Sequence, residues 1–252
     1  MAGARIWREL GNRWLAARLA VSGRVHQYPE ILALRRFLSS FSVDVVFDVG
    51  ANYGQYAQML RHDVGYCGHI FSFEPNPDVF SALSKTAAGD GKWHVFNMAL
   101  SDFDGTVPFH IMAAHQFSSI EQPAAQMDAI FNDRNRIERT VDMQCRRLDG
   151  MIDELLGPQG LNRPFLKMDT QGHDRAVCEG ATASLARVLG VQSELAVQPL
   201  YAGATEYRDM IAYLEAKGFV PNALFANNKG HFPRLVEMDG VFIRSDLARA
   251  IA

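Results

Sequence analysis

The amino-acid sequence predicts an α/β fold: a doubly wound, mostly parallel sheet of seven strands that ends in an antiparallel hairpin. Three observations lead to this prediction. Short apolar runs alternate with helix-like segments along most of the chain, which is typical of βαβ units. A glycine-containing turn follows the first apolar run, as it does at the ligand-binding edge of open α/β sheets. The last two apolar runs are joined only by a loop, so they can pair as an antiparallel hairpin.

Composition indicates an ordinary globular protein. The chain has 252 residues, of which 48% are hydrophobic and 21% charged, and this balance argues against disorder. The net charge is -3, and acidic and basic residues are mixed along the chain. The main part of the chain has no basic stripe, so we do not expect nucleic acid as a partner. Cys67, Cys145 and Cys178 are far apart, which supports neither a zinc site nor a disulfide framework. We therefore expect a reducing, cytoplasmic location.

The first 25 residues differ from the rest because they carry five arginines and one glutamate. Ile6, Leu10 and Trp14 recur at four-residue steps, which predicts an amphipathic helix. Arginines interrupt every apolar run, so we expect neither a signal peptide nor a transmembrane segment. We expect residues 1–40 to pack as a helical segment on a main domain of residues 41–252. The alternative is a helix that contacts a membrane surface or covers the substrate.

The first half of the main domain shows two strand–helix units and a third strand. Val45–Val49 and His69–Phe73 read as strands, the second stopped by a proline. Helices are predicted from Gly54 to about Arg61 and from about Pro77 to Thr86. Trp93–Met98 reads as the third strand.

A long insertion follows the third strand, at about residues 106–149. Val107–Ile111 and Thr140–Cys145 look like strands, and the segment between them is polar and compatible with helix. Long connections at strand ends commonly form lids or substrate walls. We expect substrate specificity to lie here, and Phe117 to Ile120 to touch the ligand.

The second half returns to the strand–helix rhythm before the hairpin. A helix stop signal stands at Gly218. The predicted elements are a fourth strand at Phe165–Met168, a helix at about His173–Ala186, a fifth strand at Val188–Leu195, a helix at about Thr205–Lys217, and hairpin strands at Phe219–Phe225 and Val236–Ile243.

The turn after the first strand is the strongest local signal for a ligand. Asp48 ends a buried strand, and Gly50 and Gly54 then let the chain turn into a helix while leaving bare backbone for a ligand. The glycines are spaced G-x-x-x-G, whereas nicotinamide-binding folds use G-x-G-x-x-G. The carboxylate of Asp48 would repel a pyrophosphate and favour a cationic ligand group. The alternative interpretation is a turn that binds nothing.

Acidic and small side chains follow the next two strands. Glu74 stands about twenty residues after Gly54, where a carboxylate can accept both hydroxyls of a ribose. The third strand runs into Ala99, Leu100 and Ser101, which are small and polar enough for one wall of an adenine slot. A solvated acid and a turn cap are the alternative interpretations of these two sites.

Five motifs together resemble the FkbM family of methyltransferases: Asp48-Val-Gly-Ala-Asn-Tyr-Gly, Phe73-Glu-Pro-Asn, Ala99-Leu-Ser-Asp, Leu166-Lys-Met-Asp-Thr-Gln-Gly-His and Gly240-Val-Phe. The resemblance covers roughly residues 43–243. It implies a Rossmann-like class I fold, in which a parallel sheet ends in an antiparallel hairpin. It also implies S-adenosylmethionine as the cofactor and methylation of hydroxyl groups, often on sugars or natural products.

The resemblance assigns site residues position by position. It implies Asp48, Gly50, Asn52 and Gly54 at the methionine moiety, Glu74 at the ribose, and Ala99, Leu100 and Ser101 at the adenine. Tyr53, Pro75 and Asn76, which stand within the same motifs, are further cofactor-binding candidates. The chain departs from the family pattern at Asp174, where members often have a glutamate. The shorter side chain puts the role of that acid in question.

Candidate catalytic residues follow the fourth and fifth strands. A protonated sugar hydroxyl is a poor nucleophile, so a base or a divalent metal is expected. Asp169 is the first candidate for a base or substrate anchor, His173 the second, and Glu194 the third. Asp169 could instead cap a helix, His173 could be a surface or capping residue, and Glu194 could pair with a cation. The three could also hold Mg²⁺, but no tight ligand spacing requires a metal.

The sequence therefore predicts an S-adenosylmethionine-dependent O-methyltransferase whose acceptor is a small molecule or glycan. The Asn/Asp-Pro-Pro-Tyr/Phe run of enzymes that methylate nitrogen is absent after the fourth strand, which favours oxygen as the acceptor atom. Two alternatives remain open: a nicotinamide-dependent oxidoreductase, and a non-catalytic module that binds a nucleoside.

Overall fold

The fold is seen in a computed structural model that describes residues 2–125, 133–226 and 233–251. Among these residues the strands are β1 (Val45–Val49), β2 (His69–Phe73), β3 (Trp93–Phe96), β4 (Ala99–Leu100), β5 (Gly105–Met112), β6 (Ile137–Arg146), β7 (Pro164–Met168), β8 (Gly190–Ala196), β9 (Phe219–Ala226) and β10 (Glu237–Arg244). The α-helices are α1 (Ala2–Val21), α2 (Tyr28–Ser40), α3 (Gln55–Met59), α4 (Pro77–Ala87), α6 (Ile152–Leu156), α7 (Asp174–Glu179), α8 (Thr182–Leu185), α9 (Tyr207–Ala216) and α10 (Ser245–Ile251). Shorter helical turns are η1 (Val25–Gln27), η2 (Leu60–Val64), η3 (His115–Phe117), η4 (Leu148–Gly150) and η5 (Gly157–Gln159).

The main sheet has seven strands in the order β3-β2-β1-β7-β8-β10-β9. The first five of these pair in parallel, and β10 pairs antiparallel with both β8 and β9. The predicted doubly wound sheet with an antiparallel terminal hairpin is therefore confirmed. The order reverses between β1 and β7, and a ligand crevice is expected at such a switch point.

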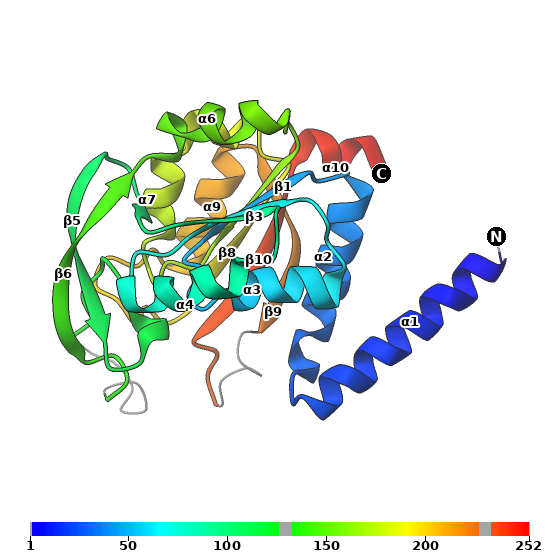
Figure 1. The fold of residues 1–252 in the computed structure, drawn as a ribbon, viewed down its shortest axis with the longest axis horizontal. Helices are drawn as coiled ribbons and strands as arrows, with labels where there is room; N and C mark the ends of the chain where they lie inside the picture. Colours follow the sequence, from blue (N-terminus) through cyan, green and yellow to red (C-terminus); the bar gives the residue numbers. More distant parts are fainter. Residues whose placement is uncertain (1, 126–132, 227–232, 252) are drawn as a thin grey trace.

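Helices cover both faces of this sheet (Figure 1). On one face α2, α3 and α4 pack against the strands, with Leu34 and Leu83 fully buried there. On the other face α6, α7 and α9 do the same, and Leu214 is fully buried. All residues of β1 and β7 are buried, because a parallel strand between two helical layers has no solvated face.

The insertion forms its own small sheet, in the order β4-β6-β5. Both strands predicted in the insertion are present, as β5 and β6, and they pair antiparallel. The segment between these two strands was predicted to be compatible with helix. Residues 126–132 of that segment lie outside the described part of the chain. The predicted third strand is shorter than expected, because the chain leaves β3 at Phe96 and joins the small sheet at Ala99.

The helix predicted at residues 173–186 is instead two short helices, α7 and α8, with Gly180 between them. A β-carbon on Gly180 would lie 1.8 Å from the backbone oxygen of Ser101. The chain therefore passes very close to the end of β4 at this point, and the helix is interrupted there. Two further helices, α6 and α10, were not predicted.

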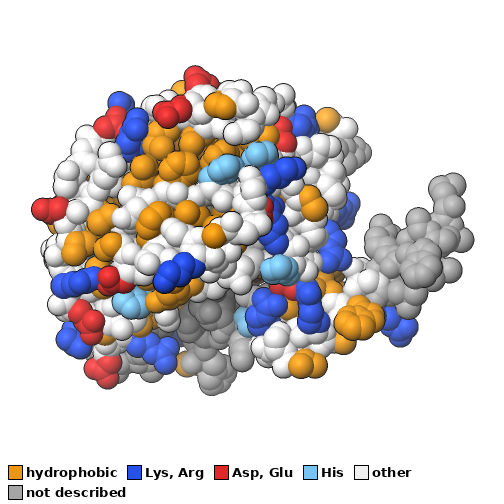
Figure 2. Space-filling model, in the orientation of Figure 1, with side chains coloured by type: hydrophobic (Ala, Val, Ile, Leu, Met, Phe, Trp, Pro, Cys, Tyr) orange, Lys and Arg blue, Asp and Glu red, His pale blue; other side chains and the backbone are white. Residues whose placement is uncertain are grey.

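The N-terminal helix α1 extends away from the sheet (Figure 1). Its carboxyl half is anchored by Leu15 and Leu19, which are buried, whereas Trp14 is 78% exposed. Figure 2 shows hydrophobic and basic side chains side by side on this part of the molecule. The side chains of Ile6 and Leu10, which belong to the predicted apolar face, lie outside the described set. Within the described residues no helix is both long and apolar enough to cross a membrane.

Candidate active site

A cavity of about 510 Å³ opens where β1, β2, β7 and β8 end. This volume lies within the usual range of small-molecule sites. Nine of the residues proposed from the sequence line it: Gly50, Asn52, Glu74, Pro75, Ala99, Leu100, Asp169, His173 and Glu194. Five proposed cofactor contacts lie outside its lining: Asp48, Tyr53, Gly54, Asn76 and Ser101. The structure thus gathers all three catalytic candidates and about half of the cofactor candidates around one cavity.

The loop after β1 is fixed by glycine at two close approaches. Gly50 has a φ of 76°, and a β-carbon there would lie 2.0 Å from the backbone oxygen of Asp169. Gly54 has a φ of 82°, and its β-carbon would lie 2.7 Å from the ring of Trp93. No other residue type fits these positions. Gly54, the N-cap of α3, is therefore required by packing, and Gly50 presents backbone to the cavity.

Glu74 occupies the position expected for a ribose acid, at the end of β2. Its Oε2 accepts a hydrogen bond from the backbone N–H of Asn52 at 2.7 Å, and its Oε1 accepts one from the N–H of Asn76 at 2.8 Å. Burial raises the pKa of Glu74 to about 7, although these two hydrogen bonds oppose the shift. Each carboxylate oxygen has a second acceptor position, which leaves room for two ligand hydroxyls.

Asp48 requires a correction. Its side chain is fully buried outside the cavity lining, with Oδ1 3.1 Å from Nζ of Lys167 and Oδ2 accepting a hydrogen bond from Ser72 at 3.0 Å. The prediction that this carboxylate directly contacts a cationic ligand group is wrong, because its charge is balanced by Lys167. Asp48 acts instead as the counter-ion of a lysine that lines the cavity.

Lys167 belongs to a cross-sheet polar row formed by Ser72, Asp48, Lys167 and Gln192. These residues stand in register on β2, β1, β7 and β8. Burial alone would lower the pKa of Lys167, but the charges of Asp48 and Asp169 reverse the shift and raise it. Gln192 accepts a hydrogen bond from the hydroxyl of Tyr56 at 2.8 Å. Sequence reasoning missed Lys167 and Gln192, although a charged residue within an apolar strand was a visible signal.

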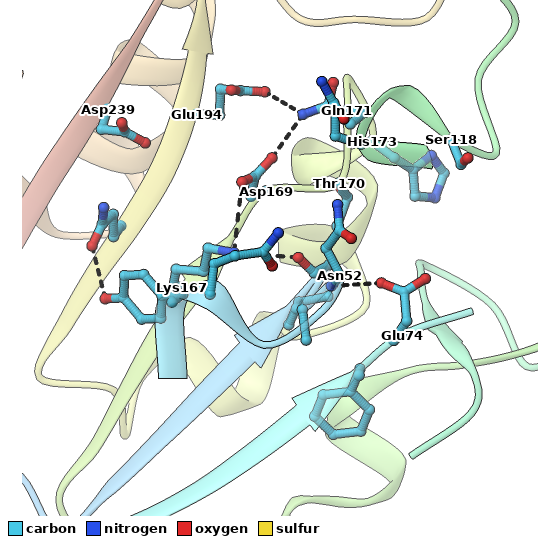
Figure 3. Close-up of a pocket in the computed structure, with 18 of the residues that line it drawn as sticks. Asn52, Glu74, Ser118, Lys167, Asp169, Thr170, Gln171, His173, Glu194 and Asp239 are labelled. Atoms are coloured by element: carbon cyan, nitrogen blue, oxygen red, sulfur yellow. Dashed lines mark hydrogen bonds and ion pairs between the residues drawn. The ribbon is translucent and has the colours of Figure 1, made fainter. Parts of the chain in front are cut away.

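Gln171 joins two of the catalytic candidates. Its Nε2 donates to Oδ1 of Asp169 at 2.8 Å and to Oε2 of Glu194 at 2.9 Å (Figure 3). Its backbone is in the left-handed region, with a φ of 55°. The hydroxyl of Tyr201 lies 2.9 Å from Gln171 Oε1. The alternative role of Asp169 as a helix cap is wrong, because His173 stands at the N-cap of α7.

His173 lies in the same cavity but has a different set of partners. Its Nε2 is 2.8 Å from Oγ of Ser101, and its Nδ1 is 2.9 Å from Oε1 of Glu121. The residue is 8% exposed, so it is not a surface histidine. It does stand at the N-cap of α7, although its side chain makes no capping hydrogen bond. With both ring nitrogens engaged, His173 ties the insertion to the predicted adenine wall.

Glu194, Glu237 and Asp239 form an acid wall at the side of the cavity made by β8 and β10. Burial, and then the charges of neighbouring carboxylates, raise the pKa of Glu194 well above its usual range. Burial and the charge of Asp169 raise the pKa of Glu237 to about 7. The pKa of Asp239 is raised by burial and by Glu30. Among the described residues, no group of three or more histidine, cysteine, aspartate or glutamate side chains is arranged so that it could hold a metal ion.

Asp174, where the family pattern often has glutamate, is buried outside the cavity lining. One carboxylate oxygen accepts hydrogen bonds from the backbone N–H and the hydroxyl of Thr170, at 2.9 and 2.6 Å. The other accepts one from Ser193 at 2.7 Å. Asp174 thus fastens the loop that carries Asp169 to the neighbouring strand β8.

The insertion reaches the cavity through the segment predicted for ligand contact. Phe117, Ser118 and Ile120 line the cavity. Oγ of Ser119 lies 2.8 Å from the backbone oxygen of Gln171. The insertion is therefore bonded directly to the loop that carries the catalytic candidates.

Most of the chain matches the model of one protein family. Residues 48–221 match the family model described as the methyltransferase FkbM domain. The hexuronic acid methyltransferase AglP of Haloferax volcanii is 27% identical over 147 residues, which are 58% of this chain and 53% of that protein. This chain thus spans about half the length of that relative.

Among solved structures, methyltransferase FkbM from Methylobacillus flagellatus KT gives a TM-score of 0.50 at 15% identity, covering 96% of this chain and 60% of that one. The magnesium protoporphyrin IX methyltransferase of Synechocystis PCC 6803 gives a TM-score of 0.47 at 10% identity, covering 88% and 81%. The first of these likenesses supports the class I methyltransferase fold.

Proposed function

Because this chain belongs to the FkbM methyltransferase family, we propose that it transfers a methyl group from S-adenosylmethionine to a hydroxyl of a sugar, glycolipid or secondary metabolite. One observation carries the proposal: the Gly50 loop, Glu74 and Asp169, from three successive strand ends of the sheet, line a single cavity. The family argues against a nicotinamide-dependent oxidoreductase.

The described residues fit the cofactor. The carboxylate of Glu74 can accept both ribose hydroxyls. Met98, Ala99 and Leu100 give an apolar wall for adenine, and the bare backbone of Gly50 lies where the methionine moiety would follow. When bound, S-adenosylmethionine supplies a methyl group on a positively charged sulfur. The chain's own residues must then align the acceptor and take its proton.

Asp169 and Glu194 are the groups that we propose for the proton. With the cofactor bound, the acceptor oxygen would take the methyl group, and the pair of the broken methyl–sulfur bond would remain on sulfur. The hydroxyl proton passes to a carboxylate. Asp169 is the preferred acceptor of the proton, because the raised pKa of Glu194 favours a protonated carboxyl that cannot accept one, whereas Oδ2 of Asp169 lies 3.7 Å from the ammonium of Lys167. Gln171 holds both carboxylates in place.

A sugar is the acceptor class that the curated relative supports, since that protein is named as a hexuronic acid methyltransferase. A cavity lined by carboxylates and amides offers acceptors and donors for several hydroxyl groups.

Calorimetry with S-adenosylhomocysteine tests the cofactor half of the proposal. We expect binding with a micromolar dissociation constant, and no binding of NADH in a parallel fluorescence titration. Binding of NADH without S-adenosylhomocysteine would return the protein to the oxidoreductase class. Binding of S-adenosylhomocysteine without turnover of any hydroxyl acceptor would favour a non-catalytic nucleoside-binding module.

A further inference from the structure

The cavity is strongly acidic. Among the described residues that line it, the acids are Glu30, Glu74, Asp169, Glu194, Glu237 and Asp239, and the lysines and arginines are Arg24 and Lys167. Both cations are already engaged. Arg24 lies 2.9 Å from Asp63, and Lys167 lies between Asp48 and Asp169. An anionic ligand therefore finds no uncommitted lysine or arginine among the described lining residues.

The acid wall lies away from the expected nucleoside end. Glu74 directly follows β2, whereas Asp239 is on β10, four positions along the sheet order. Neighbouring strands are about 4.8 Å apart, so the two strands are separated by roughly 19 Å. Figure 3 shows Glu74 and Asp239 on opposite sides of the site, with Asp169 between them. The acid wall therefore borders the half of the cavity that a nucleoside leaves open.

Two members of the acid wall lack a partner. Glu194 and Asp239 are opposite each other in the β8–β10 pairing, and Glu237 is two residues away, so all three point to one face of the sheet. Glu237 is only 7% exposed. No hydrogen bond or ion pair joins Glu237 or Asp239 to another described residue. Glu237 is buried and Asp239 is half-buried, and a buried carboxylate without a donor is costly unless a ligand supplies the donor or the charge.

We propose, on the basis of the function proposed above, that the acid wall binds an ammonium group of the acceptor, which makes the acceptor class an amino sugar or another amine-bearing polyol. The ammonium lies between Glu237 and Asp239 and donates to both carboxylates. A hydroxyl of the same molecule then points at Asp169, across Gln171. An acceptor with a carboxylate in place of the ammonium brings no donor and no positive charge to Glu237 and Asp239, so it loses these interactions.

This specificity separates the chain from its curated relative. A hexuronic acid carries a carboxylate, which offers Glu237 and Asp239 neither a donor nor a positive charge. The two proteins are 27% identical, so a different acceptor charge is compatible with a shared fold and cofactor site.

Three sugars that differ only at carbon 6 test the proposal: 6-amino-6-deoxyglucose, glucose and glucuronate, which carry an ammonium, a hydroxyl and a carboxylate. Their binding is measured by saturation-transfer NMR near neutral pH, on the free protein and on the protein loaded with S-adenosylhomocysteine. We expect the amino sugar to bind about tenfold more tightly than glucose, and glucuronate to bind least.

The double variant Glu237→Gln with Asp239→Asn removes the two charges and keeps the side-chain shapes. We expect it to abolish the preference for the amino sugar and to leave the affinity for S-adenosylhomocysteine within about twofold. The exposed acid Glu215 on α9, changed to Gln, is the matched control and is expected to preserve the preference.

The proposal is overturned if the three sugars bind equally, if none of them binds, or if glucuronate binds best. It is also overturned if the double variant loses affinity for S-adenosylhomocysteine, because the acid wall would then hold the cofactor's own ammonium. Failure of the wild-type protein to bind S-adenosylhomocysteine would count against the proposed function alone, since the free protein still reports its preference among the sugars.

Discussion

At the scale of single residues, Asp169 is the side chain on which the chemistry depends most. It is held by Gln171 on one oxygen and approached by Lys167 on the other. Asp169→Asn keeps the shape but removes the basic oxygen, so we expect turnover to fall by about 10²–10⁴. Affinity for S-adenosylhomocysteine should stay within about twofold of the wild type, as measured by calorimetry beside a methyl-transfer assay. Asp209→Asn on the exposed face of α9 is the control. Normal turnover by the Asp169 variant would remove this residue from the mechanism.

Glu74 makes cofactor binding sensitive to pH. Its pKa is raised to about 7, and only the ionised carboxylate can accept from both ribose hydroxyls. Affinity for S-adenosylhomocysteine should therefore rise about tenfold from pH 6 to pH 8, as the ionised fraction grows from about one tenth to about nine tenths. Calorimetry across this range measures it. Glu74→Gln should bind more weakly and lose the dependence, and a variant that keeps the full slope would show that another group titrates.

Site residues that directly follow a strand could be predicted from the sequence, but contacts between side chains of neighbouring strands could not. Glu74 and Asp169 follow apolar runs, and the carboxyl ends of parallel strands share one edge of the sheet. The role of Asp48 was misjudged because its partner, Lys167, is 119 residues away and is set by the register of β1 and β7. Glu237 and Asp239 were missed for the same reason, since they reach the site through antiparallel pairing with β8.

At the scale of elements, the break between α7 and α8 is a point of high packing density. A β-carbon at Gly180 would meet the backbone oxygen of Ser101 at 1.8 Å, and backbone cannot move aside as a side chain can. We expect Gly180→Ala to lower the free energy of unfolding by about 3 kcal/mol or more, as measured by urea denaturation.

Gly89→Ala is the matched control for that experiment. A β-carbon there meets no heavy atom within 4 Å, and its φ is not positive. The change should be neutral or slightly stabilising, because alanine restricts the unfolded chain. Equal losses in the two variants would contradict the packing argument.

Secondary structure was predictable wherever one local signal dominated. β1 and β2 begin and end at the residues expected, because buried parallel strands are apolar throughout. The single helix expected at residues 173–186 is wrong, since two short helices stand there, and Gly180 between them packs against Ser101, about 80 residues earlier in the chain. Tertiary contacts of this kind leave no periodic signal in the sequence.

At the scale of the whole molecule, buried carboxyls set how stability changes with pH. The pKa values of Glu74 and Glu237 are each raised from 4.5 to about 7. Between these values the folded protein holds protons that the unfolded chain has lost, so stability falls as pH rises. Each shift corresponds to about 3 kcal/mol at full ionisation. The lowered pKa of His69 acts in the opposite direction.

We therefore expect the thermal midpoint to fall by on the order of 10 °C from pH 5 to pH 8, as followed by circular dichroism. Glu237→Gln should be more stable than the wild type at pH 8 and should show a shallower slope. Glu215→Gln should follow the wild-type curve. A midpoint that rises over this range would mean that these carboxyls are not buried in solution.

The loop after β1 and the loop after β7 are locked together, because Gly50 leaves no room for a side chain against Asp169 and Asp174 fastens the second loop to β8. The parts that serve the methyl donor thus form one inflexible unit. The insertion and the terminal hairpin only border it. Evolution toward a new acceptor can therefore remodel those borders, one residue at a time, while the methyl-donor machinery is inherited intact.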